Sequence, residues 1–172
     1  MSSVFASSST LQATVGVMVS ANESHVQLDV THVTTVVAAS SAILANSSAI
    51  AVAGLLLLSR SAALQLTDFV ATVDDYSNVT TTLAAVHSVS VGVLVVAALG
   101  HVTTNASNLC MKCIDGCFVG SASTSTMPSA VVAAMSIVIL SARGNAELRN
   151  ITSILAHRSE VALTSAAAAS VA

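Results

Sequence analysis

Apolar and polar residues alternate along several stretches of the chain. The alternating apolar positions are Val15, Val17 and Val19; Val26, Leu28 and Val30; and Val89, Val91, Val93 and Val95. Alternation with a period of two places every second side chain on one face of a β-strand. Valine and threonine are also stiff at χ1 and favour strands over helices. The pattern therefore predicts a mainly β protein.

A tripeptide repeat suggests how the strands are arranged. Val-Thr-Thr begins at Val33, Val79 and Val102, each time after His or Asn, so the starts lie 46 and 23 residues apart. Units of this size are typical of solenoid proteins, in which each coil stacks on the next through small residues. We therefore expect a solenoid-like fold, a parallel β-helix with coils of about 23 residues. The three valines would then lie in line along the stack.

A helical membrane bundle of three or four spans is the alternative. Apolar stretches cover residues 4–21, 33–58, 81–99 and 129–140, and the charged residues lie mostly between them. Two of these stretches are long enough to cross a bilayer as helices. However, aromatic residues make up 2% of the chain and Trp is absent, whereas membrane helices usually carry aromatic residues at both interfaces. The shortage of aromatics favours the solenoid.

The expected organisation has three parts. Residues 1–109 form a β-repeat region, residues 110–120 a cysteine-bearing loop, and residues 121–172 a degenerate repeat with an amphipathic tail. In that tail, Leu148, Ile151 and Leu155 are spaced as on one face of a helix. A short C-terminal helix is therefore expected.

The few charged residues limit the partners and the location. They make up 8% of the chain, the net charge is −3, and five Lys plus Arg do not form a groove that follows phosphates. No nucleic-acid partner is expected, whereas membrane association stays open and a protein or carbohydrate partner is unidentified. The first six residues carry no basic side chain, so no ordinary signal peptide is expected.

By texture, about half of the chain resembles a known group of proteins. The stretches are residues 32–54, 64–77, 78–105 and 147–165, which are rich in Val, Ala, Ser, Thr and Leu with scattered Asn-X-Ser/Thr. They look like the large dispersed-gene-family surface proteins of kinetoplastid parasites. This resemblance implies a surface-exposed, glycosylated β-solenoid without known catalysis.

Cys110, Cys113 and Cys117 form the one local cluster with distinctive chemistry. A disulfide, unpaired buried thiols and a metal site are all compatible with this spacing, although structural zinc needs a fourth ligand. His101 would supply one only if the chain folded back. We expect at most one disulfide, because three cysteines leave at least one unpaired, and Cys110–Cys113 is the least favourable pair in a strand.

Five Asn-X-Ser/Thr sequons mark candidate glycosylation sites. They begin at Asn22, Asn46, Asn78, Asn105 and Asn150. Glycans on these residues would imply an exposed surface of an exported protein. Asn, Ser and Thr also suit the corners of a solenoid, so both interpretations stay open.

No residue pattern predicts catalysis or a cofactor site. Asp74 and Asp75 precede Tyr76 in a segment that we interpret as a solvated turn. The strongest challenger is His87 together with one of these aspartates, but no nucleophile elbow or phosphate-binding loop accompanies them. We therefore expect a non-enzymatic surface or extracellular module, adhesive or structural. The alternatives are a small membrane protein of unknown role or a gene fragment without selected function.

Overall fold

The chain folds almost entirely into β-strands. The computed structural model describes residues 3–8, 12–47, 50–83, 87–123, 131–165 and 170–171. Within these residues there are ten strands and no helix, so the prediction of a mainly β protein is confirmed. The strands are β1 (Ser3–Ser8), β2 (Gln12–Val37), β3 (Ala42–Ser47), β4 (Ile50–Val73), β5 (Asn78–Leu83), β6 (His87–Cys113), β7 (Phe118–Ser123), β8 (Val131–Leu155), β9 (Glu160–Ser165) and β10 (Ser170–Val171).

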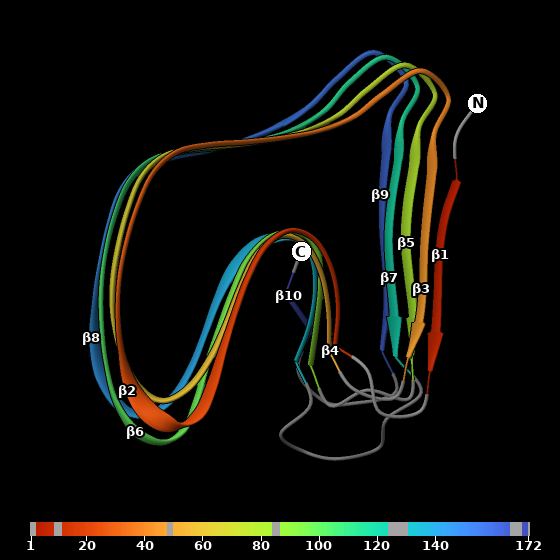
Figure 1. The fold of residues 1–172 in the computed structure, drawn as a ribbon. Coiled ribbons are helices and arrows are strands. Elements are labelled where there is room, and N and C mark those ends of the chain that lie inside the picture. The colour runs from red at the N-terminus through yellow and green to blue at the C-terminus, as the bar shows by residue number, and fades with distance from the viewer. Residues whose placement is uncertain are drawn as a thin grey trace.

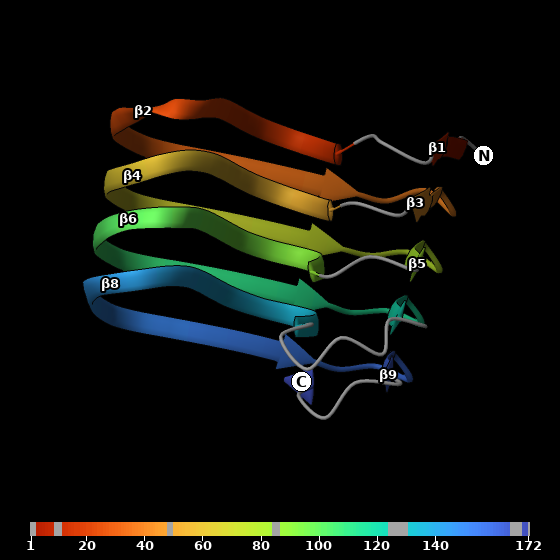
Figure 2. The ribbon, with the colours of Figure 1, turned by 90° about the horizontal axis from the view of Figure 1, so that it is seen from below.

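All strand pairs are parallel and form two sheets. The short strands make one sheet in the order β1-β3-β5-β7-β9, and the long strands make the other in the order β10-β8-β6-β4-β2. The chain runs through both sheets in four successive passes, which cover residues 12–47, 50–83, 87–123 and 131–165. Figure 1 views these passes nearly superimposed, and Figure 2 shows each one lying beside the next. Parallel pairing requires this repeated return of the chain to the same edge.

The spacing between paired strands is longer and less regular than the expected 23 residues. Val37 pairs with Val73, 36 residues later, whereas His87 pairs with Val131, 44 residues later. The predicted line of three valines is also wrong. Val33 pairs with Phe69, Val79 lies in the other sheet, and Val102 pairs with Ala62. Val-Thr-Thr recurs because these residue types favour strands, and not because it marks one position of the pass.

The core follows the alternation of each long strand. Leu64, Leu66, Ala71 and Val73 of β4 point inward and are fully buried, while Gln65 between them is exposed. Inward-facing residues of neighbouring passes lie in register, so each one packs against its equivalents on both sides. Small and medium side chains fill this interior, which explains why the chain needs so few aromatic residues.

The predicted C-terminal helix is wrong. Residues 143–155 belong to β8, and Leu148, Ile151 and Leu155 pair with the inward-facing Ala106, Leu109 and Cys113. Between the first two of these lies Asn150 with a φ of 53°, in the left-handed region. That residue turns the strand and shifts the phase of the alternation by one position. A bent strand therefore reproduces the three-then-four spacing of a helix face.

Two paired glycines allow the long strands to approach each other. Gly54 and Gly92 lie in register and have φ of 146° and 141°. A Cβ atom on Gly92 would lie 1.9 Å from the carbonyl oxygen of Ser136, and one on Gly54 would lie 2.0 Å from that of Gly92. Because a side chain would meet backbone at both positions, only glycine fits.

The alternative of a helical membrane bundle is wrong for the described residues. The apolar segments 81–83 and 87–99, like 33–37 and 50–58, are strands where the structure describes them. No helix among the described residues is long and apolar enough to cross a membrane. These apolar segments pair in register with other apolar strands. A strand that is buried in a parallel sheet is expected to be apolar along its length, so their apolar character does not require a membrane.

Candidate interaction surface

The four passes lie side by side and together form what we call the stack. Each pass bends at two places, its first and second corners, and a ladder of four polar side chains runs along the first corner. It consists of His32, Asp68, Asn108 and Asn150, with φ of 57°, 56°, 57° and 53°. The His32 Nε2 lies 3.1 Å from Asp68 Oδ2. The Asn108 amide donates to Asp68 Oδ1 at 2.9 Å, and the Asn150 amide donates to Asn108 Oδ1 at 3.0 Å. We call these four residues the corner ladder.

The residue types of the corner ladder follow from its backbone. Asn, Asp and His are the non-glycine residues that most readily adopt the left-handed conformation. Each pass bends at the same place, so the equivalent side chains lie one strand spacing apart and reach one another. The ladder is exposed, and its His–Asp contact alone contributes little to stability. Its main consequence is to hold the four corners in register.

A second corner of each pass turns the chain from the long sheet into the short one. Its paired left-handed residues are Ala39 and Ser40, Asp75 and Tyr76, Asp115 and Gly116, and His157 and Arg158. Backbone bonds link equivalent turns, for example from the Tyr76 amide to the Asp115 carbonyl at 3.0 Å. The solvated turn expected at Asp74–Tyr76 is present there.

The cysteines lie at this second corner in the third pass. Cys113 and Cys117 are joined by a disulfide with a Cα–Cα distance of 5.8 Å, and Cys110 is a half-buried free thiol. Cys110 and Cys113 are part of strand β6, so the cysteine-bearing segment begins inside a strand. No group of three His, Cys, Asp or Glu side chains suited to a metal is found within the described part of the chain.

One outward face of the long sheet is polar at every position but Ala63. We call it the polar face; it comprises the outward-pointing side chains of residues 27–31, 63–67, 103–107 and 145–149. Across three positions the passes present Gln27, Ala63, Thr103 and Asn145; Asp29, Gln65, Asn105 and Glu147; and Thr31, Thr67, Ser107 and Arg149. In the two middle passes the polar members are hydroxyls and amides without charge. Such a surface offers donors and acceptors at strand spacing.

The last pass leaves an edge of the long sheet open. Strand β8 pairs with β6 on one side, and on the other side β10 covers Val132 and Ala133. All residues from 141 to 155 are exposed. Leu148, Ile151 and Leu155 are 40%, 41% and 53% exposed, although they occupy inward-facing positions. We call residues 143–155 the tail edge.

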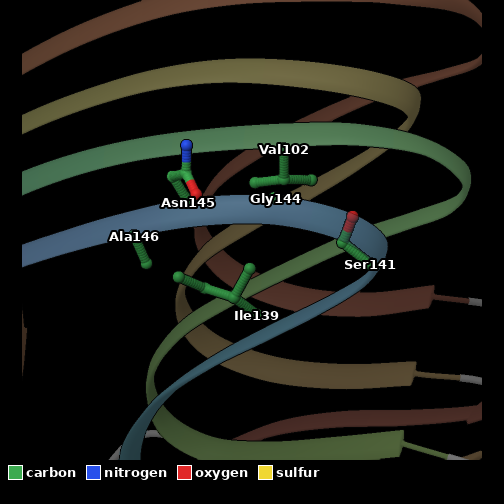
Figure 3. A pocket seen from close by; sticks show the side chains of 6 residues that line it. All are labelled: Val102, Ile139, Ser141, Gly144, Asn145 and Ala146. Carbon is green, nitrogen blue, oxygen red and sulfur yellow. The ribbon is translucent and has the colours of Figure 1, made fainter.

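A shallow hollow of about 230 Å³ lies at the bend beside the tail edge (Figure 3). Its lining consists of Val102, Ile139, Ser141, Gly144, Asn145 and Ala146. The Ser141 hydroxyl donates to the Gly100 carbonyl at 3.0 Å, which ties the bend to the preceding pass. None of the six lining side chains is ionisable, so the hollow supplies no acid or base.

The sequons fall on different parts of the stack. Asn105 lies on the polar face, and Asn78 is the exposed first residue of β5, where its Oδ1 accepts from Thr80 at 2.6 Å. The amide nitrogen of Asn150 is engaged in the corner ladder. The side chains of Asn22 and Asn46 lie outside the described residues, and so does that of His87, the expected challenger for catalysis.

The first corner of each pass, which carries the corner ladder, was missed from the sequence. In each pass the first left-handed residue precedes the second corner by seven positions, as Asp68 precedes Asp75 and Asn108 precedes Asp115. That constant interval was a usable signal, hidden because the passes themselves differ in length. Comparison with known proteins adds no relative: no protein-family model, curated protein or solved structure matches the chain.

Proposed function

We propose that the chain is a non-enzymatic β-solenoid module that acts at the cell surface or outside the cell, in a structural or adhesive role. The observation that carries this proposal is the repetition of the same corner, core and ladder positions in four passes. A stack of this kind buries a continuous core between neighbouring passes. It also presents flat outer faces whose side chains can vary without loss of the core.

The polar face supports an adhesive role. Hydroxyl and amide side chains repeat there along two directions, which suits a flat, uncharged polar partner better than a compact charged ligand. Phosphate-rich partners are disfavoured by the net charge of −3. The non-ionisable hollow supports the non-enzymatic part of the proposal, because acid–base catalysis needs a titratable group in place.

Exposed sequons and the resemblance to surface proteins support the proposed location. Asn78 and Asn105 are exposed, so glycans on them would extend into solvent without disturbing the core. Charged residues make up only 8% of the chain, and the polar face carries mainly hydroxyl and amide side chains.

Two measurements test the proposal. Far-UV circular dichroism with and without detergent should give a single β minimum in both; a helical double minimum appearing in detergent would contradict the solenoid. Expression through a secretory pathway should give a protein that endoglycosidase shifts in mobility. The variants Asn78→Gln and Asn105→Gln should each remove part of that shift, and Asn145→Gln, which is exposed and lies outside any sequon, should not. An unglycosylated product retained inside the cell would contradict the surface location.

A further inference from the structure

The two ends of the stack fit each other. Within the described residues, β2 pairs with β4 on one side only, and β8 pairs with β6 along residues 143–155 on one side only. We call residues 25–37 of β2 the head edge. Because all strands are parallel, the head and tail edges are opposite edges of the same sheet. We propose that a second copy of this chain binds with its head edge against the tail edge of the first.

Side chains at the two edges are equivalent members of the same internal columns. Val30, Leu66, Ala106 and Leu148 form one column, and Val33, Phe69, Leu109 and Ile151 form another. In the middle passes their members are at most 1% exposed, because neighbours cover them on both sides. In the same register, Val30 of one copy would cover Leu148 of the other, and Val33 would cover Ile151. The exposed apolar surface of the tail edge would then be buried as it is inside the stack.

The backbones of the two edges bend at the same places. His32 at the head and Asn150 at the tail have φ of 57° and 53°, and Ala39 and His157 have φ of 58° and 56°. Two edges with matching bends and the same strand direction pair their free N–H and C=O groups along their whole length. The corner ladder would also continue from Asn150 to His32 of the second copy. This backbone match favours a second copy over an unrelated strand.

The charges at this interface are compatible with pairing. Glu147 would lie opposite Asp29, but Arg149 bonds Glu147 and would lie diagonal to Asp29. Diagonal neighbours across parallel or antiparallel strands are within reach of long side chains. One guanidinium would therefore lie between two carboxylates, and Arg143 would face His25.

Strands β1 and β10 cover small parts of the two ends and must be displaced. β1 pairs with β3 through six residues, and β10 pairs with β8 through two. In the assembly, β9 would take the place of β1 against β3, and the start of β2 would take the place of β10. Inside the stack, β6 and β8 share twenty-two paired positions. A contact of the same kind between β8 of one copy and β2 of the next would therefore form more backbone pairs than the displacement of β1 and β10 removes.

Contacts of this head-to-tail type do not close and produce linear assemblies. Four passes at the usual strand spacing predict a rise of about 19 Å per copy. The inference rests on the proposed solenoid for its geometry, but it concerns the partner and not the fold. A β-rich protein that stays monomeric would overturn this inference alone, whereas a helical protein would overturn the proposed function as well.

The test uses one blocking variant for each edge. Ile151→Lys places a charge in the inward column of the tail edge, and Val33→Lys does the same at the head edge. Ile154→Glu is the matched control, because Ile154 is 37% exposed and points outward, and the introduced carboxylate would lie opposite Lys112. Circular dichroism verifies that each variant keeps the β spectrum; Ser153→Lys is the second tail variant if Ile151→Lys does not fold.

Sedimentation velocity at increasing concentration measures the outcome. The wild-type protein and Ile154→Glu should form a growing series of linear oligomers, and each blocking variant alone should stay monomeric. A mixture of Ile151→Lys and Val33→Lys should form one-to-one dimers and nothing larger, because one free head meets one free tail. A monomeric wild-type protein, blocking variants that still form long oligomers, or a mixture that stays monomeric would overturn the proposal.

Discussion

At the scale of single residues, each member of the corner ladder has two roles: its backbone adopts the left-handed conformation, and its side chain bonds a neighbouring pass. Asn108 adopts a left-handed backbone and also bonds Asp68 above it and Asn150 below it. Asn105, three positions earlier in the same strand, is exposed on the polar face in an extended segment. Replacing each of the two by alanine therefore compares a corner with a face at nearly the same site.

Asn108→Ala should lower the free energy of unfolding by about 1–3 kcal/mol. The loss combines a left-handed alanine with two lost hydrogen bonds. Asn105→Ala should change it by less than about 0.5 kcal/mol, as is usual for an exposed face. Asn108→Gly keeps the backbone freedom and removes only the bonds, so it should fall between the two. Urea denaturation followed by circular dichroism measures all three, and equal effects of the two alanine variants would contradict the assigned role.

Equivalent positions in the stack also suggest how to replace the disulfide. Where the third pass has Cys113 and Cys117, the second pass has Val73 and Ser77. The double variant Cys113→Val, Cys117→Ser should keep the fold and lose about 2 kcal/mol, the value expected for closing so short a loop. Thiol titration should find one free thiol in the unreduced wild-type protein and none in Cys110→Ser. A second free thiol would contradict the pairing of Cys113 with Cys117.

At the scale of strands, alternation predicted the elements well and their bends poorly. The runs around Val17, Leu28 and Val93 all lie in long strands, as expected. The alternation continues through each corner with one residue added, and this shift made the tail resemble a helix. A pattern of period two cannot reveal a bend whose cause is the left-handed conformation of a single Asn or Asp. The side-chain contacts of that residue come from a strand about 40 positions away.

The close approach of the glycines makes a sharp prediction for strand pairing. Gly92→Ala should lower the free energy of unfolding by more than about 3 kcal/mol or prevent folding, because its Cβ would lie 1.9 Å from the Ser136 carbonyl oxygen. Ser136→Ala is the control: this residue pairs with Gly92 and already carries a Cβ atom. Its replacement should cost less than about 1 kcal/mol. Thermal unfolding of both proteins measures the difference, and a mild effect of Gly92→Ala would contradict the observed register.

At the scale of the whole molecule, the sequence repeat failed because the passes differ in length. Neighbouring corners lie 36 residues apart between His32 and Asp68 and 42 apart between Asn108 and Asn150. Most of the extra residues enter between the end of a short strand and the start of the next long one: Ile50 follows Ser47 by three positions, whereas Val131 follows Ser123 by eight. Gly16, Gly54 and Gly92 do recur every 38 residues and lie in register, but three glycines carry too little information alone. The candidate surfaces depend on this stacking, so they could not be predicted before it was known.

The stack should also unfold from its ends, and this gives a prediction for hydrogen exchange. Each pass is stabilised by its neighbours, so a middle pass has two stabilising interfaces and an end pass has one. Amides of residues 69–73 and 109–113 should therefore exchange more slowly than those of residues 151–155, whose side chains are exposed. Mass spectrometry of the monomeric Ile151→Lys variant measures this gradient without interference from assembly. Uniform protection across the four passes would mean that the molecule opens as one unit, and it would contradict an architecture held together by nearest-neighbour contacts.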